Sequence, residues 1–542
     1  MPEQVRTAEQ GKSVKREAGI LRSAGVVSAA IAVSRVTGLL RESVLGWLFG
    51  ASAVFDAYVL GYRIPNLARD LFAEGALASA FVPTFTRYLA TKSKEEAREL
   101  SNITATLLMV VVGSLCLLGM IFSPVFVNLF ASGFHAVPGK FELAVQLVRI
   151  VFPFLLLVAL AAQAQGILNA HRQFGIPALS SSLFNIGSIL AGLTLGYWLG
   201  PRLGISPVHG MAFGIVFGGM AQLAFQLPAV WRAGFGWRPC WNLRHEGVRS
   251  IFALMGPAVL SGISVQVNML VNTNFAAGLR DASGNIMNGP VSWLSYAFRF
   301  QQLPLGLFGV AIASATLPSI ARSAAVHNYE EFRDTLSRSI VMILLMTIPS
   351  SVGLAVLGES MIGIVYQHGR FLASDTHQTA LALSCYSVGI ASYSILKLVG
   401  PAFYALGDAR TPMFVSMASI LVNAGCAFLM VRVLGLGHAG LALSLSLVSI
   451  FNLLTLLLFL SPRIGGLRGG EVAVSFGKIL IAAGFMGLVC LGIVRLSPSR
   501  TFHVMAGIPA GAAAFYVAAS LLRVPALRET REVVLRKFRR TT

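Results

Sequence analysis

Apolar stretches of about 20 residues, separated by short polar segments, recur along nearly the whole chain of 542 residues. A helix rises about 1.5 Å per residue, so a stretch of about 20 residues spans the hydrocarbon core of a bilayer. The pattern therefore predicts an all-α polytopic membrane protein with about fourteen transmembrane helices. Their expected centres are residues 37, 60–80, 112, 157, 189, 219, 264, 308, 346, 390, 422, 450, 484 and 512.

The composition supports the membrane prediction. Hydrophobic residues make up 55% of the chain and charged residues 12%, and the mean hydropathy is +0.73, which excludes an ordinary soluble domain. The net charge is +20. If the N-terminus lies in the cytoplasm, most of the Lys and Arg residues fall in cytoplasmic segments, as the positive-inside rule requires. We therefore attribute the basic charge to membrane topology and expect no nucleic-acid partner.

Two further features narrow the class. The five Cys residues are far apart, which predicts neither a disulfide framework nor a zinc site. The basic first residues precede an apolar run too long for a signal-peptide core, so we expect no cleavage.

An internal repeat predicts two halves. The segment ALASAFVPTFTR, beginning at Ala76, resembles AIASATLPSIAR, beginning at Ala311, which lies 235 residues later. We predict two parallel, pseudo-symmetric six-helix bundles around a central cationic cavity. The expected parts are a cytoplasmic basic tail (1–23), an N-terminal lobe (24–231), a cytoplasmic linker (232–248), a C-terminal lobe (249–462), two additional helices (476–522) and a second cytoplasmic basic tail (523–542).

Charged residues interrupt the apolar pattern at the start of each half. Arg35 and Arg41 lie about 120° apart on the first predicted helix, and Arg299 lies in the corresponding region of the second half. A central Arg costs about 2.5–3.5 kcal/mol on membrane insertion, so it persists where it meets water, a partner or a ligand. Each of these residues either binds an anion in a polar cavity, forms a structural ion pair or extends its charged group to the membrane interface.

The second predicted helix carries Pro65 and Asn66 between Arg63 and Arg69. Pro lacks a backbone donor and disfavours helical geometry in the preceding residue, so we predict a helix broken at this point and lining the cavity. Asp70 and Glu74, one turn apart, are expected to pair with Arg69 or to cap the break. Asp56 is a further acid in this segment.

Other polar residues in the apolar stretches have simpler interpretations. Amides there are expected to form hydrogen bonds between helices; they are Asn185, Gln222, Gln266, Asn268, Asn272, Asn423 and Asn452. Lys397 either lines the cavity or extends to the interface. His368 and Arg370 are expected to meet water, with a gating role as the alternative, and His171 and His438 are expected in loops.

Three motifs resemble one family closely. SRVTGLLRE, DAYVLGYRIPNLARDLFAEGALASAFVP and SYAFRFQQLPLGLFGVAIASATLPS are similar to the MviN/MurJ lipid II flippases of the multidrug/oligosaccharidyl-lipid/polysaccharide exporter superfamily. The resemblance implies a transporter, not an enzyme, in the bacterial inner membrane. It would move the undecaprenyl-pyrophosphate-linked peptidoglycan precursor to the outer leaflet by alternating access, in cell-wall biogenesis and the maintenance of cell shape. Both chain termini would be cytoplasmic.

The resemblance also implies site residues. Arg35, Arg41, Arg69 and Arg299 would bind the pyrophosphate, and the two additional helices would form a groove for the lipid tail. The supporting or gating residues would be Ser34, Glu42, Asp56, Arg63, Pro65, Asn66, Asp70 and Glu74.

The chain departs from the family pattern at three positions. Glu42 replaces an Asp, Asp70 replaces a second Arg, and Phe298 stands where an acid is common. Some relatives also bind sodium through acids in the seventh and eleventh helices. This chain has Asn272 and Asn423 there, so we do not assign the sodium site of those relatives to it. We expect no cofactor or metal, with the membrane potential as an energy source and the coupling ion left open.

The expected partners are lipid II and membrane lipids, with cell-wall synthesis enzymes as further candidates for a monomeric carrier. The alternatives are a flippase for another polyprenyl-linked oligosaccharide and a cation or drug antiporter. The antiporter would require a buried carboxylate facing its substrate. A glycosyltransferase or ligase is less favoured, because it would require paired acids or a metal motif. A scaffold is also less favoured, because it has no need of intramembrane Arg.

Overall fold

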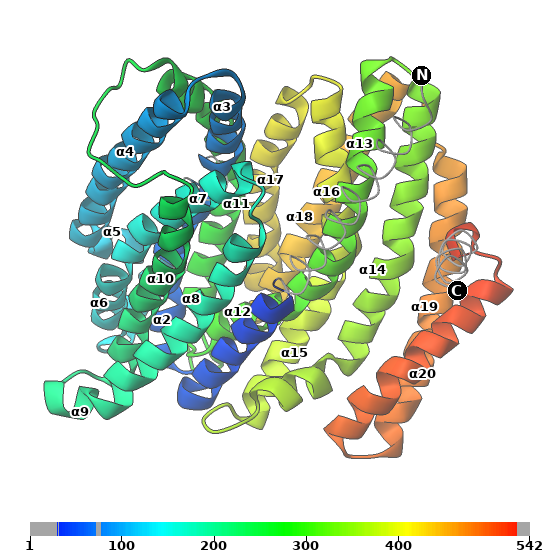
Figure 1. Cartoon of the computed structure of the whole chain (residues 1–542). Coiled ribbons are helices and arrows are strands. Elements are labelled where there is room, and N and C mark those ends of the chain that lie inside the picture. Colours follow the sequence, from blue (N-terminus) through cyan, green and yellow to red (C-terminus); the bar gives the residue numbers. More distant parts are fainter. Residues whose placement is uncertain (1–29, 31, 72–76, 528–542) are drawn as a thin grey trace, which may run out of the picture. The chain divides into compact units, whose positions relative to one another are not determined.

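The computed structural model describes residues 30, 32–71 and 77–527, and every regular element in these residues is a helix (Figure 1). The all-α prediction is confirmed. The elements up to the linker are a helix over residues 32–49, α2 (Ala53–Ala68), α3 (Ala78–Thr91), α4 (Lys94–Ile121), α5 (Ser123–Ala131), η2 (Ser132–Ala136), α6 (Lys140–Val151), α7 (Pro153–Ala170), α8 (Gly175–Leu193), η3 (Thr194–Trp198), α9 (Gly200–Leu203) and α10 (Pro207–Arg232).

The second half contains longer helices. Its elements are α11 (Glu246–Ala277), α12 (Pro290–Pro304), η4 (Leu305–Val310), α13 (Ala311–Ala325), α14 (Tyr329–Tyr366), α15 (Ala373–Ser387), α16 (Ile390–Ala405), α17 (Arg410–Phe428), η5 (Leu429–Val433), α18 (Gly437–Leu460), η6 (Ser461–Ile464), α19 (Gly469–Leu496) and α20 (Arg500–Leu521).

Ten helical stretches within the described residues are long and apolar enough to cross a membrane. The pair α15 and α16, bent by 44°, brings the number to 11 if it forms one span. All of these coincide with predicted spans. The predicted span near residue 264 falls on α11, which is not among these stretches, and the predicted spans near residues 37 and 60–80 contain residues outside the described set. The total of fourteen therefore stays a prediction.

The chain divides into two compact units. Unit 1 comprises Met1–Leu45, Ala57–Leu129 and Val137–Ile263, and unit 2 comprises Gly46–Asp56, Phe130–Ala136 and Ser264–Thr542. Two short segments from the first half of the sequence therefore belong to the second unit.

Within unit 1, α8 and α10 pack closely through small residues. A Cβ atom at Gly214 would lie 2.4 Å from the Ser188 carbonyl oxygen, and one at Gly210 would lie 2.3 Å from the Gly196 backbone. Such close approach brings helix backbones into van der Waals contact, which stabilises helix pairs where lipid provides no hydrophobic driving force. The predicted linker belongs to the same unit, because its backbone N–H groups at residues 238 and 240 donate to side chains of α4.

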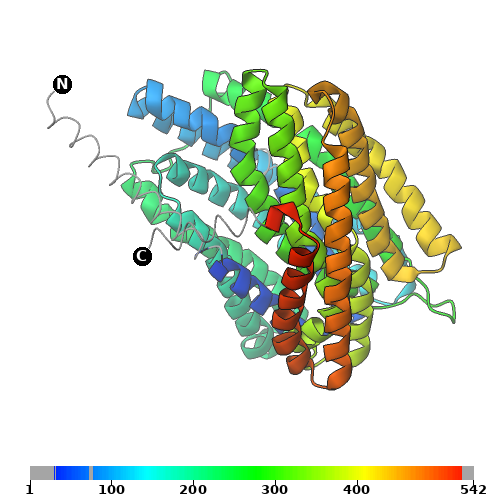
Figure 2. The same cartoon turned by 90° about the vertical axis from the view of Figure 1, so that its right-hand side faces the viewer.

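Within unit 2, α14 is the central helix and contacts α13, α15, α16, α19 and α20. The last two helices, α19 and α20, lie side by side in both views and pack against α14 (Figures 1 and 2). The core between the helices of this unit consists of fully buried aliphatic and aromatic side chains such as Phe332, Leu336 and Phe403. Packing against α14 therefore anchors the two additional helices.

Helical turns of the wider π type occur at related places. The turns η3 and η5 lie 235 residues apart, which is the spacing of the sequence repeat. Residues 69–71 are also π-helical, and η4 follows them at nearly the same spacing. Among the described residues, these π turns therefore recur at or near the spacing of the sequence repeat.

The prediction that the second helix breaks at Pro65 is wrong. The helix α2 continues through Pro65 to Ala68, and the π-helical residues 69–71 follow it. Other helices also contain an internal Pro, among them α14 and α20. A single missing donor is tolerated in a membrane helix when neighbouring groups compensate for it, so the Pro alone does not end α2.

We predict that Gly214→Ala lowers the stability of the protein, because its new Cβ would overlap a backbone oxygen of α8. Overpacking of this kind costs about 1–3 kcal/mol. The melting temperature in detergent measures the effect. Gly113→Ala is the matched control, because no atom lies within 4 Å of its Cβ position in α4, and its higher helix propensity should raise stability slightly. Equal melting temperatures for the two variants would contradict the packing argument.

Candidate functional site

Arg41 is a buried cation of unit 1 with few polar partners. It is 7% exposed, and its guanidinium carbon lies 5.2 Å from the ring centre of Phe184 and 5.6 Å from that of Tyr62. Its Nη2 donates to Glu42 over 3.5 Å, and its Nε has no hydrogen-bond partner among the described residues. Arg41 is thus held by aromatic faces and retains donor capacity, which suits it to bind an anion.

Arg35 differs from Arg41 in environment, although both lie on the helix over residues 32–49. Arg35 is exposed, whereas Arg41 is buried. The neighbouring Ser34 contributes its backbone, because its carbonyl accepts from the Asn185 amide at 3.3 Å. Asn185 also donates to Thr37 at 3.3 Å, so its predicted role as a bond between helices is confirmed.

The end of α2 brings Arg69 and Asp70 together. Arg69 donates to the Asp70 Oδ1 atom from Nη2 at 2.8 Å and from Nε at 3.1 Å. The predicted pairing of Asp70 with Arg69 is confirmed. Arg63 is half-buried, and Asn66 has a buried Oδ1 atom with no partner in the described part of the chain. Glu74 lies outside the described residues.

Asp56 serves as a helix cap within unit 2. Its carboxylate is fully buried and accepts from the Gly289 N–H at 2.8 Å and from the Ser292 N–H at 3.0 Å. The Ser292 hydroxyl donates to the same carboxylate at 2.5 Å. Gly289 is the N-cap of α12 and has no side chain, so Asp56 supplies the cap from a distant part of the sequence. This cap holds the helix that carries Arg299.

Arg299 is exposed and lies about 15 Å along α12 from its capped end. The preceding Phe298 packs edge-on against Tyr386. Lys397 is exposed as well. His368 and Arg370 are also exposed, which agrees with their predicted contact with water.

A hydrogen-bonded amide cluster joins α11, α17 and α18 in unit 2. The Asn423 amide donates to the Asn272 Oδ1 atom at 3.1 Å and to the Asn268 carbonyl at 3.2 Å. Asn268 donates to Ser419 at 3.1 Å, and Asn272 donates to the Leu441 carbonyl of α18 at 3.3 Å. The prediction that these amides bond between helices is confirmed. The described residues contain no group of three His, Cys, Asp or Glu residues that could hold a metal ion.

Sequence reasoning misses Asp375 and misplaces His438. Asp375 is buried and accepts from the Trp293 indole at 3.0 Å and from the Leu372 N–H at 3.0 Å. The prediction of a loop position for His438 is wrong, because it is buried in the first turn of α18, where its ring lies 4.9 Å from that of Trp293. For Asp375, an acid in the first turn of a helix is a capping signal. No local signal indicates the burial of His438, which depends on distant segments.

These features define a class of protein: a polytopic helical membrane protein with charged residues inside apolar helices and with the fold of the multidrug exporters. A multidrug resistance MATE family transporter in an inward-facing conformation has this fold, with a TM-score of 0.60 and 17% sequence identity. The match covers 81% of this chain and 94% of that chain.

The family described as lipid II flippase MurJ matches residues 46–508, and the chain belongs to this family. The lipid II flippase MurJ of Burkholderia cenocepacia is 32% identical over 439 residues, covering 80% of this chain and 82% of that protein. A structure of lipid II flippase MurJ in an inward closed conformation matches with a TM-score of 0.75 and 26% identity, covering 91% of this chain and 98% of that chain. The predicted family is confirmed.

We predict that Asp56→Ala destabilises the protein by about 2–4 kcal/mol, because it leaves buried donors at the start of α12 without an acceptor. Thermal unfolding in detergent measures the loss. Asp281→Ala is the matched control, since Asp281 also accepts from two backbone N–H groups but is exposed to water. A loss at Asp281 as large as that at Asp56 would refute the capping role.

Proposed function

We propose that this protein is a lipid II flippase of the bacterial cytoplasmic membrane. The observation that carries the proposal is the family match over residues 46–508, supported by a curated relative that is named for this activity and aligns with 80% of the chain. The protein would move the undecaprenyl-pyrophosphate-linked precursor of peptidoglycan from the inner to the outer leaflet. Its charge distribution supports a topology with both chain termini in the cytoplasm.

We propose that Arg35, Arg41 and Arg69 of unit 1 and Arg299 of unit 2 bind the pyrophosphate of the substrate. A guanidinium group is permanently charged and matches phosphate oxygens in a bidentate manner. The Nε of buried Arg41, unpartnered within the described residues, supports this role, because an anion would satisfy a donor that costs free energy when left unpaired. The acids that follow Arg41 and Arg69 pair with them and would keep these cations in place when no substrate is bound.

The lipid tail would run along α19 and α20. Many large apolar side chains of these helices are exposed, among them Phe485, Leu488 and Met505, and an undecaprenyl chain could cover them. The substrate would cross by alternating access, in which the two halves of the carrier open first to one side and then to the other.

A cation antiporter of the same fold has less support. It would require a buried carboxylate available to its substrate, but the buried Asp56 and Asp375 both accept backbone and side-chain hydrogen bonds. The buried carboxylate of Glu42 pairs with Arg41. The relatives are named as flippases, which supports a transport function and not an enzymatic one.

We predict that Arg41→Ala and Arg299→Ala each accumulate in the membrane but abolish flipping, because each removes a cation that binds the pyrophosphate. Complementation of a bacterium depleted of its own flippase, with membrane abundance checked by immunoblot, tests this. Arg202→Ala is the matched control, because Arg202 is exposed in the short helix α9 and should be dispensable. Wild-type growth with either cavity substitution at native expression would refute the assigned roles.

We also predict that the membrane potential drives export. The pyrophosphate carries roughly two negative charges, and moving each outward across an inside-negative membrane gains about 2.3 kcal/mol per 100 mV. The empty carrier would return with a positive cavity, which the same potential favours. In proteoliposomes, setting the potential to zero with valinomycin and equal potassium should stop flipping even when a sodium or proton gradient is maintained. Continued flipping at zero potential would refute this electrical mechanism.

A further inference from the structure

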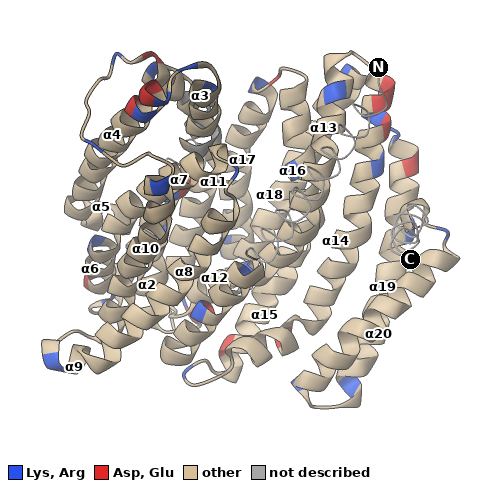
Figure 3. Cartoon of the chain, in the orientation of Figure 1, with Lys and Arg blue, Asp and Glu red and all other residues tan. Residues whose placement is uncertain are grey.

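A pocket of about 480 Å³ lies in unit 2 at the ends where α14 and α19 begin. The segment just after α20 forms another wall of this pocket. The polar lining includes Ser337, Arg338 and Lys478, and Val341 and Val474 are apolar neighbours. Charged residues gather at these ends of α14 and α19, whereas the following stretches of both helices are uncharged (Figure 3). The volume is in the range of sites that bind small molecules or headgroups.

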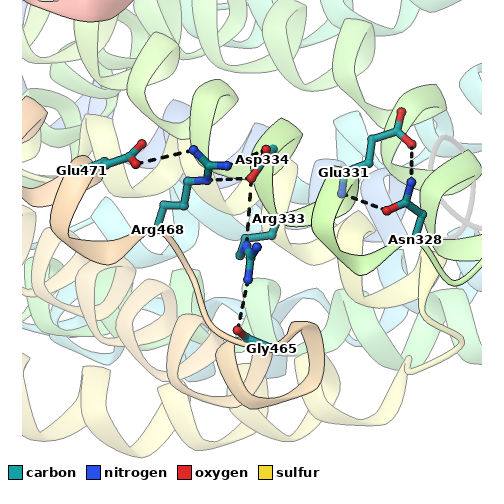
Figure 4. Close-up of polar contacts among 7 residues, drawn as sticks. All are labelled: Asn328, Glu331, Arg333, Asp334, Gly465, Arg468 and Glu471. Carbon is teal, nitrogen blue, oxygen red and sulfur yellow. Dashed lines mark hydrogen bonds and ion pairs between the residues drawn. The ribbon is translucent and has the colours of Figure 1, made fainter.

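Both acids that line the pocket are engaged by arginines. The Arg468 Nε lies 2.6 Å from Asp334 Oδ1, and its Nη2 donates to Asp334 Oδ2 at 2.7 Å (Figure 4). The Arg468 Nη1 donates to Glu471 at 3.5 Å. The Nε of Arg333 lies 4.0 Å from Asp334 Oδ1. Two acids are thus matched by two arginines, and the network as a whole is close to neutral.

Arg338 and Lys478 add positive charge without ion-pair partners. Neither makes an ion pair or hydrogen bond with any described residue. A neighbouring hollow shares Arg338 and contains Glu330 and Glu331, but Glu331 bonds reciprocally with Asn328 to cap α14 (Figure 4). Among the described residues, no acid forms an ion pair with Arg338 or Lys478, which lie on helices that pack together.

A buried hydroxyl faces the same space. Ser337 is 4% exposed, lines the pocket, and its Oγ has no hydrogen-bond partner among the described residues. Serine hydroxyls inside helices often donate to a carbonyl one turn back, as the Thr347 hydroxyl does further along α14. An unpaired buried donor beside two cations points to a ligand with anionic oxygen acceptors.

The depth of the pocket indicates where that ligand comes from. After Arg338, the next charged residue of α14 is Glu359, and after Lys478 the next charged residue of α19 is Arg495. The uncharged stretches between them measure about 30 Å and about 24 Å, close to the thickness of a hydrocarbon core. Arg338 and Lys478 are thus the last charges before the membrane interior, at the level of lipid headgroups.

We propose that this pocket binds the phosphodiester headgroup of an anionic membrane phospholipid. Arg338 and Lys478 pair with the phosphate oxygens, the Ser337 hydroxyl donates to one of them, and Val341 and Val474 contact the start of the acyl chains. Basic pockets between transmembrane helices at the interface recognise anionic lipids in this manner. The bound lipid links α14 to α19, the first of the two additional helices. This assignment does not depend on lipid II transport.

Native mass spectrometry of the full-length protein, titrated with phosphatidylglycerol, tests the proposal. The variant Arg338→Gln/Lys478→Gln should weaken the first binding event about tenfold, and Ser337→Ala should weaken it about threefold. Arg495→Gln is the matched control, because it removes an exposed cation at the opposite end of α19, and it should bind within about twofold of the wild type. Phosphatidylglycerol should also raise the melting temperature of the wild type and of Arg495→Gln but not of the double variant.

Three results would overturn the proposal. Equal phosphatidylglycerol binding by the double variant and the wild type would show that the pocket is not the site. Full competition by inorganic phosphate at the same concentration would identify a site for free phosphate instead of a lipid. A parallel tenfold loss of lipid II binding in the double variant would assign the pocket to the transported substrate. If lipid II bound to none of the proteins, the proposed transport function would fail while the phospholipid site would stand.

Discussion

The hydrocarbon interior of a membrane provides no hydrogen-bond partner, and this constraint determines where the polar groups of the chain lie. Asp56 is fully buried only because three donors at the start of α12 surround it. The Asn423 amide donates to the Asn272 amide and to the Asn268 backbone carbonyl between helices. Arg41 differs from these hydrogen-bonded groups. Its aromatic neighbours stabilise its charge, but one of its donors has no partner within the described residues. A polar group that the fold does not satisfy is the feature that best marks a place for a ligand.

The cap on α12 connects parts of the chain that are far apart in sequence. Residues Gly46–Asp56 belong to unit 2, and Asp56 supplies the acceptor that the N-cap Gly289 lacks. The same short segment contacts the loop after α14, where the Arg370 N–H donates to the Trp47 carbonyl at 3.0 Å. The segment is therefore held at two places in unit 2, and the position of α12 depends on residues near the beginning of the chain.

The sequence is sufficient to predict the helical class, the positions of most spans and the family, because each follows from local hydropathy, spacing or motif. Of the seven amides predicted to bond between helices, four do so in the described part of the chain: Asn185, Asn268, Asn272 and Asn423. The sequence is insufficient where a distant segment decides the outcome. Pro65 suggests the end of a helix, but α2 continues for three more residues. A loop position is predicted for His438, but Trp293 and the Gln378 carbonyl contact its ring. The pairing of Asp70 with its neighbouring arginine needs no distant information and is predicted correctly.

The π-helical turns bear on the history of the chain. A π turn closes its hydrogen bond over five residues instead of four, so it accommodates one more residue than an α turn. The turns Thr194–Trp198 and Leu429–Val433 occupy the same place in the two halves of the sequence. If the halves arose by duplication, the simplest explanation is that the extra residue of this π turn was already present in the single ancestral half before that half was copied. The ancestor would then already have had widened helices at these points, and both copies would have kept them while most of their side chains diverged.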